Sequence, residues 1–241
     1  MRRRRLWPMV LITAGIALAG GLVVVDRLGG KEAPVELPKC GDRPTTPGID
    51  VSYHQDVIRW PRVRKAGIRF AFIRVSDGTT FADPRFRDNW EGARAAKIAR
   101  GAYQFFRPEE SAIAQADLLI AAIARDRGEL PPAIDVEVSG GRTHQQVVTA
   151  IRTWVERVRA RLGVEPIVYT SPELWRDLTG NADFSSQPLW IAHYTTDCPR
   201  VPPAWSAWAF WQHSKTGTVP GIQGHVDLDV FAGELEALRR R

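Results

Sequence analysis

Short apolar runs alternate with longer amphipathic stretches along most of the chain, starting near Gly48. Runs of this length, rich in β-branched and aromatic residues and bounded by Gly, Pro, Asp or Ser, are typical of buried strands. Eight of them predict strands, at residues 48–53, 70–75, 101–106, 133–138, 166–170, 189–194, 207–212 and 226–230. Because helical stretches separate the earlier runs, we expect parallel βαβ units.

Capping signals and helical spacing predict the helices. Asp83-Pro84 offers an N-cap and a first-turn proline, and residues 111–125 form an Ala-rich helix. Thr143 and Gln146 have the spacing of a capping box, followed by an apolar stripe of Val147, Ile151, Trp154, Val155, Val158 and Leu162. Few helices fit between the last strands. We therefore predict an α/β fold, a single irregular TIM-like (β/α) barrel with fewer helices in its C-terminal half.

The first 25 residues predict a transmembrane anchor or a signal peptide. Arg2–Arg5 precede twenty uncharged residues, 6–25, which can just span a bilayer core of about 30 Å. The arginines favour a cytoplasmic N-terminus, with everything after Asp26 outside. Ala17-Leu18-Ala19 resembles a cleavage site, but the apolar run continues to Val25, which favours an uncleaved anchor. Both alternatives export the domain, to the periplasm or the cell exterior.

Composition and charge divide the rest of the chain. Residues 26–47 are rich in Pro and Gly and predict a linker, 48–235 form the barrel, and 236–241 are a basic tail. Of the net charge of +6, four charges come from Arg2–Arg5 and three from Arg239–Arg241, so the remainder is near −1. This distribution argues against a nucleic-acid-binding face.

The two cysteines, Cys40 and Cys198, lie far apart and lack metal-ligand spacing. An even count in an exported chain predicts one disulfide, with two unpaired thiols as the alternative. The five histidines also lack the spacing of a zinc site. We therefore expect no metal site.

Asp135 and Glu137 are the strongest candidates for chemistry. They alternate along the predicted strand 133–138, so both side chains emerge on one face. Burial and mutual repulsion push the pKa values of such a pair apart, which glycoside hydrolysis requires of its acid and its carboxylate. A helix N-cap or a surface ion pair is the alternative for this dipeptide pattern. If the barrel closes, Asp50 and Asp227 become neighbours, because the first and last strands then pair.

Aromatic and amide groups also stand near predicted strand ends. A flat apolar face with a polar edge suits a sugar ring. Candidate substrate-binding residues are Tyr103, Tyr169, Trp190, Tyr194, Trp211 and Gln212. Core packing is the alternative for each, and it is preferred for Trp90 and Trp154 on predicted helix faces.

Several segments, in order along the chain, resemble the family 25 glycoside hydrolases, lysozymes of the Chalaropsis and Streptomyces type. They are Gly48–Ser52, Gly101–Tyr103, Pro132–Glu137, Tyr169-Thr170, Leu189–Tyr194, Trp211-Gln212 and Val226–Asp229. The resemblance implies an irregular barrel without cofactors that cleaves the β-1,4 bond between N-acetylmuramic acid and N-acetylglucosamine in peptidoglycan. It implies Glu137 as general acid and Asp135 as the assisting carboxylate, with Asp50 and Asp227 as further acids of the site.

Three positions depart from the family pattern: Asp77, Gln104 and His213 stand where many members have Glu, His and Tyr. These changes leave the form of the substrate open, for instance its O-acetylation. Two other functions also stay open, a glycan-binding module without turnover and a glycosidase acting on a chitin-like polymer. Protein partners cannot be read from the sequence.

Overall fold

The computed structural model describes residues 40–195 and 197–239. The predicted anchor, most of the predicted linker and the end of the basic tail lie outside these ranges. No helix within them has the length and hydropathy needed to cross a membrane.

Eight strands form a closed barrel, in the order β1-β9-β8-β7-β6-β5-β4-β2, with β2 pairing back to β1. A ninth, β3 (Phe81–Ala82), pairs antiparallel with the end of β2. The barrel strands are β1 (Thr46–Val51), β2 (Phe70–Asp77), β4 (Ala99–Phe105), β5 (Ala133–Asp135), β6 (Ile167–Thr170), β7 (Leu189–Ala192), β8 (Phe210–Gly217) and β9 (Val226–Phe231).

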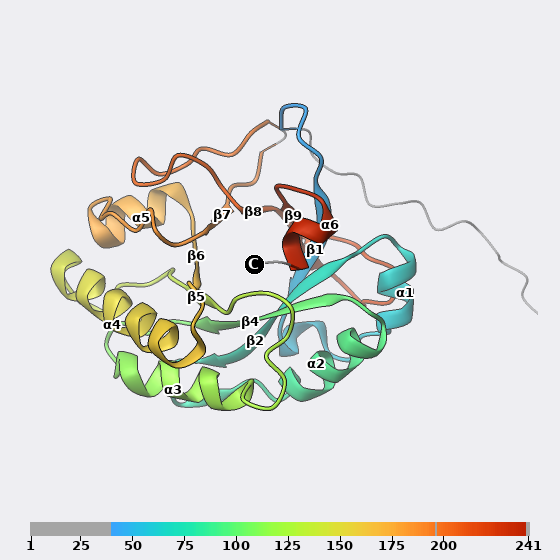
Figure 1. Cartoon of the computed structure of the whole chain (residues 1–241), viewed down its shortest axis with the longest axis horizontal. Coiled ribbons are helices and arrows are strands. Elements are labelled where there is room, and N and C mark those ends of the chain that lie inside the picture. The colour runs from blue at the N-terminus through green and yellow to red at the C-terminus, as the bar shows by residue number, and fades with distance from the viewer. Residues whose placement is uncertain (1–39, 196, 240–241) are drawn as a thin grey trace, which may run out of the picture. The chain divides into compact units, whose positions relative to one another are not determined.

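The helices α1 to α5 lie around the outside of the strands (Figure 1). Most of them connect successive strands in the first part of the chain, and the described residues between β7 and β9 contain none, as predicted. The helices are η1 (Tyr53–Gln55), α1 (Trp60–Lys65), α2 (Phe86–Ala95), α3 (Ala112–Ala122), α4 (His144–Leu162), α5 (Pro172–Thr179) and α6 (Leu235–Arg239).

The predicted cap of α4 is confirmed and that of α2 is wrong. Thr143 and Gln146 form a capping box, and the whole predicted apolar stripe of α4 is buried. Asp83 does not cap α2, which begins three residues later. Its carboxylate instead accepts hydrogen bonds from the Arg74 side chain and from the backbone N–H of Tyr53 and Arg85.

The last strand of the barrel departs from the parallel arrangement expected for the earlier strands. β9 runs antiparallel to both β8 and β1. Only residues 218–225 connect β8 to β9, and a parallel crossover needs about a dozen residues or more. A hairpin is therefore the only connection that this length allows. As a result β9 presents its N-terminal end, with Asp227, at the edge where the parallel strands present their C-terminal ends.

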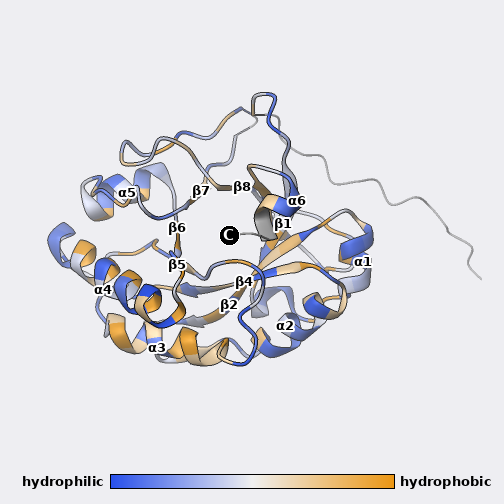
Figure 2. Ribbon diagram, in the orientation of Figure 1, coloured by the Kyte–Doolittle hydropathy of each residue, from blue (hydrophilic) through white to orange (hydrophobic). Residues whose placement is uncertain are grey.

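The barrel separates two apolar cores. Alternate residues of β2 show the division: Phe70 and Phe72 pack inside with Trp190 and Phe210, whereas Ala71 and Ile73 pack outside against helices. In Figure 2 helices such as α2 and α4 carry both hydrophilic and hydrophobic residues, as expected for helices that bury one face against strands. Because aromatic rings fill the barrel interior, no ligand fits inside it. A site must therefore lie at an end of the barrel.

A disulfide joins Cys40 to Cys198, as predicted. It links the segment before β1 to the long connection between β7 and β8. Residues 40–47, which the sequence assigned to the linker, thus include this crosslinked cysteine and the start of β1 at Thr46.

Candidate active site

A cavity of about 220 Å³ opens at the end of the barrel where the carboxyl ends of the parallel strands meet. Its walls come from both ends of the described sequence, since β1 and β9 are paired neighbours. The lining residues are Asp50, Val51, Ser52, His54, Gln55, Arg74, Tyr103, Phe105, Asp135, Glu137, Tyr169, Trp190, Gln212 and Asp227. The structure therefore gathers all four predicted acids in one small cavity.

Asp135 and Glu137 enter the cavity from β5 and the residues that follow it. Backbone hydrogen bonds from Phe106 N to Asp135 O and from Val136 N to Tyr169 O hold this segment extended between its neighbours. Asp135 is buried and Glu137 half-buried. Burial raises the pKa of both carboxyl groups, and their mutual contact raises the pKa of Asp135 further. The pair therefore tends to share one proton.

Asp50 and Asp227 face each other as register partners on β1 and β9. Burial raises the pKa of both, to about 6 for Asp227, and the charges of Asp229 and Asp227 add to the rise at Asp50. Asp229 was not assigned to the site, yet its fully buried carboxyl contacts Asp50. Burial and the charge of Asp227 raise the pKa of Asp229. Its position on the inward face of β9, two residues from Asp227, was the available signal.

Gln212 organises the centre of the site through its amide. Its Oε1 accepts hydrogen bonds from the hydroxyl groups of Tyr169 and Tyr194, each at 2.9 Å. With the oxygen so occupied, Nε2 donates to Asp50 Oδ2 at 2.7 Å. Burial raises the pKa of Tyr169, which keeps its hydroxyl protonated. The network thus links β6, β7, β8 and β1 and orients Asp50.

The predicted aromatic residues take different positions. Tyr103, Tyr169 and Trp190 line the cavity. The ring of Trp190 stacks on Phe72 at 4.3 Å, and its Nε1 donates to Asp229. Tyr194 is 51% exposed, just beyond β7.

Trp211, predicted as a substrate-binding residue, does not line the cavity. It is fully buried in the outer core, where its Nε1 donates to the carbonyl oxygen of His193 at 2.7 Å. On β8 the neighbouring Gln212 side chain faces the cavity, so alternation along the strand sends the Trp211 side chain outward.

Arg74 is a charged cavity residue that sequence reasoning missed. It continues the inward alternation of Phe70 and Phe72 on β2, a signal that was present in the pattern. Its side chain is nearly buried and forms an ion pair with the fully buried Asp83 at 3.1 Å. The Arg74 charge also acts to lower the pKa of Asp135. The cavity thus contains a fixed cation among its carboxyl groups.

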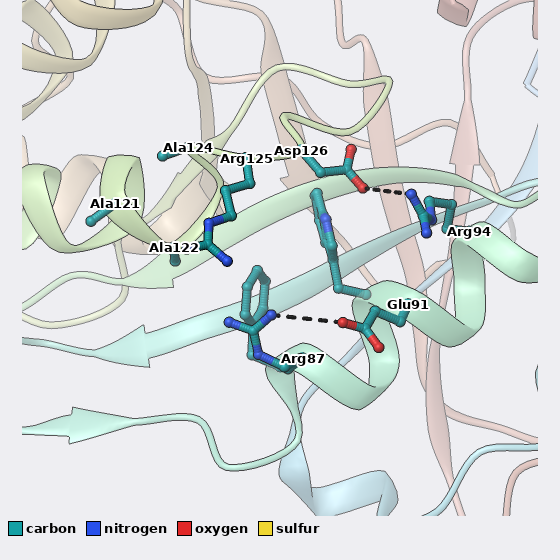
Figure 3. Close-up of a pocket in the computed structure, with 10 residues that line it drawn as sticks. Arg87, Glu91, Arg94, Ala121, Ala122, Ala124, Arg125 and Asp126 are labelled. Atoms are coloured by element: carbon teal, nitrogen blue, oxygen red, sulfur yellow. Dashed lines mark ion pairs between the residues drawn. The ribbon is translucent and has the colours of Figure 1, made fainter.

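A larger hollow of about 540 Å³ lies outside the barrel, between α2 and the segment that follows α3. Figure 3 shows its ion pairs, Arg87 with Glu91 and Arg94 with Asp126. None of the site carboxyls lines it. Among the described residues, no group of three or more potential metal ligands is arranged to hold a metal ion. The paired carboxyls line the smaller cavity instead.

Comparison with known proteins agrees with this geometry. The sequence model of "Glycosyl hydrolases family 25" matches residues 49–222. The chain belongs to glycosyl hydrolase family 25. It is therefore a glycoside hydrolase, and the resemblance noted in the sequence is confirmed.

Family 25 relatives match most of the domain. Lysozyme M1 of Streptomyces globisporus is 38% identical over 203 residues, covering 79% of this chain and 69% of that protein. The N,O-diacetylmuramidase of Chalaropsis sp is 30% identical, covering 76% and 96%. The crystal structure of a lysozyme from Streptomyces coelicolor has a TM-score of 0.75 at 35% identity, covering 80% and 94%.

The three departures from the family 25 pattern do not line the cavity. Gln104 is buried in the outer layer, where it donates to Ser76 and accepts from Trp154 Nε1. Asp77 forms a bidentate ion pair with Arg107. His213 lies beside Trp211, and burial lowers its pKa to about 4. The cavity itself keeps the four acids that the resemblance assigns to the site, Asp50, Asp135, Glu137 and Asp227.

Proposed function

We propose that this domain is a lysozyme, an N-acetylmuramidase that hydrolyses the β-1,4 bond between N-acetylmuramic acid and N-acetylglucosamine in peptidoglycan. The observation that carries the proposal is the Asp135–Glu137 pair, which lines the cavity of a family 25 barrel. The names of its relatives, lysozyme and N,O-diacetylmuramidase, support peptidoglycan as the substrate.

Glu137 acts as the general acid in this proposal. Burial raises its pKa, which favours the protonated form that a general acid needs, and it is the more exposed member of the pair. Asp135 lies deeper, where burial and the contact with Glu137 raise its pKa, and the nearby charge of Arg74 opposes that rise. Glu137 then gives its proton to the leaving oxygen, while Asp135 supports the positive charge that develops at the sugar.

The contact between the two carboxyls bears on the stereochemical course. Inverting glycosidases hold their acid and base about 6.5–9.5 Å apart, with a water molecule between them. Asp135 and Glu137 are in hydrogen-bonding contact, so this pair is not spaced for inversion. Asp135 Oδ1 is buried and receives no hydrogen bond from the described residues. It is thus available to accept one from the substrate's acetamido N–H, which fits a route assisted by the substrate.

We further propose that the domain works outside the cytoplasm, tethered by residues 1–25. The support is the run of Arg2–Arg5 before twenty uncharged residues. The Cys40–Cys198 disulfide also fits an oxidising compartment. Fractionation of cells that express the full chain, with protease added from outside, tests this placement. Recovery of the intact protein in the soluble cytoplasmic fraction contradicts it.

The decisive experiment digests purified peptidoglycan with the protein and with Glu137→Gln. Mass spectrometry of the fragments, after reduction of new sugar ends, identifies the residue at the cut. We expect reduced muramic acid ends, and a loss of rate of at least about 10²-fold in the variant, because a general acid contributes this much or more. Binding without fragments from a folded protein would instead favour a glycan-binding module. Cleavage of chitin oligomers alone would identify a different glycosidase.

A further inference from the structure

Three of the five large hydrophobic residues that are exposed in the described ranges are aromatic and stand near the cavity. Tyr53 is 39% exposed, Phe81 40% and Tyr194 51%. Exposed single rings are common, but exposed rings that are held in place beside a ligand cavity are characteristic of recognition surfaces. Tyr53 and Phe81 were not among the predicted substrate-binding residues.

Tyr53 and Phe81 form one unit, which we call the aromatic platform. Their ring centroids are 5.3 Å apart. The Arg74 guanidinium lies 5.1 Å from the Tyr53 ring centroid and 5.8 Å from that of Phe81. Asp83 holds Arg74 by an ion pair and also accepts a hydrogen bond from the backbone N–H of Tyr53. Because a buried ion pair supports both rings, the platform is preorganised and loses little freedom when a ligand binds.

The platform is continuous with the cavity. His54 and Arg74 both line the cavity, and the His54 ring centroid lies 4.1 Å from that of Tyr53. A chain that leaves the cavity on this side therefore meets the platform next.

The strand order places the platform across the cavity from Tyr194. Around the barrel, β2 and β7 are four strands apart in either direction, and β5 and β9 are likewise opposite. Phe81 pairs with the end of β2, and Tyr194 follows β7. Asp135 stands on β5 and Asp227 on β9. The line from Tyr194 to the platform thus crosses the line that joins the two groups of carboxyls.

We propose that the aromatic platform of Tyr53 and Phe81 is a binding site for a sugar of the same glycan strand, beyond the sugars at the cut. The strand then runs across the cavity from Tyr194 to the platform, with the carboxyls on its two flanks. This inference rests on the proposed function. The C–H face of a hexose packs against an aromatic face, while its hydroxyl groups stay in water. Such a site gives long strands an advantage over short fragments.

The test compares Tyr53→Ala/Phe81→Ala with unaltered protein on two substrates, peptide-free glycan strands and a tetrasaccharide of the same repeat. We expect the KM for long strands to rise roughly 5- to 30-fold, because the variant loses one or two aromatic contacts. The KM for the tetrasaccharide should change much less. Val57→Ala is the matched control, since Val57 is 65% exposed and does not line the cavity. Tyr53→Phe should keep the long-strand KM, because it keeps the ring.

Equal changes in KM for both substrates, or no change for long strands, refute the proposal that the platform binds a sugar of the strand. If the unaltered protein cleaves neither substrate, the proposed function fails instead. The platform is then tested by sedimentation of the full chain with insoluble peptidoglycan. Equal binding by the protein with and without Tyr53→Ala/Phe81→Ala refutes it there too.

Discussion

The buried carboxyl group of Asp229 should make the stability of the folded protein depend on pH. It is 1% exposed, its Oδ1 accepts from Trp190 Nε1 at 2.8 Å, and no described N–H or O–H group donates to its Oδ2. Asp50 is its contact on that side. The folded protein therefore keeps a proton on this carboxyl pair at pH values where the unfolded chain has lost it. Asp229→Asn keeps an oxygen for Trp190 and supplies an N–H for Asp50.

The size of the effect follows from proton linkage. Above pH about 4 the unfolded Asp229 is ionised, so each proton that only the folded state holds costs about 1.4 kcal/mol of stability per pH unit. This cost is absent below the unfolded pKa and grows as pH rises toward the folded pKa. The less buried Asp227 already has its pKa raised to about 6. As pH rises from 4 to 6, Asp229→Asn should therefore gain stability relative to unaltered protein, by up to about 1.4 kcal/mol per pH unit.

Urea unfolding, followed by tryptophan fluorescence at half-unit steps of pH, measures the difference directly. Asp126→Asn is the control with the opposite sign, because the hydrogen bonds from Arg100 lower the pKa of Asp126. Its stabilising contribution is present above the unfolded pKa and is lost as pH falls. A difference between Asp229→Asn and unaltered protein that stays flat or falls from pH 4 to pH 6 refutes a proton held at Asp229.

Two further predictions concern activity and packing. Cleavage should fall as pH rises through the raised pKa of Glu137, because the acid must hold its proton. Glu137→Gln should remove this limb from the kcat/KM profile of its residual activity. A limb that persists in the variant contradicts Glu137 as the acid. Trp211→Phe should cost about 1–3 kcal/mol in unfolding free energy, through lost volume and the lost bond to His193, and leave KM for glycan strands unchanged. A raised KM with unchanged stability would indicate instead that Trp211 contributes to substrate binding.

Much of the site could be predicted because strand alternation is a local property. Asp135 and Glu137 share a face whatever surrounds them, and Arg74 follows Phe70 and Phe72 by the same rule. The prediction of Trp211 as a cavity residue shows the limit of reading one residue at a time. Gln212 and Trp211 are adjacent, so they cannot both face inward, and only the neighbours of β8 decide which does.

The sequence by itself determined the elements whose signals lie within a few residues of each other. The capping box at Thr143, the buried stripe of α4 and the short link that forces β8 and β9 into a hairpin are all of this kind. Only the tertiary structure decided the contacts between distant segments. The pairing of β1 with β9 sets Asp50 against Asp227 and Asp229, and the strand order sets the aromatic platform opposite Tyr194. These contacts depend on closure of the barrel, which buries both apolar faces of the strands at once, and no local pattern encodes that closure.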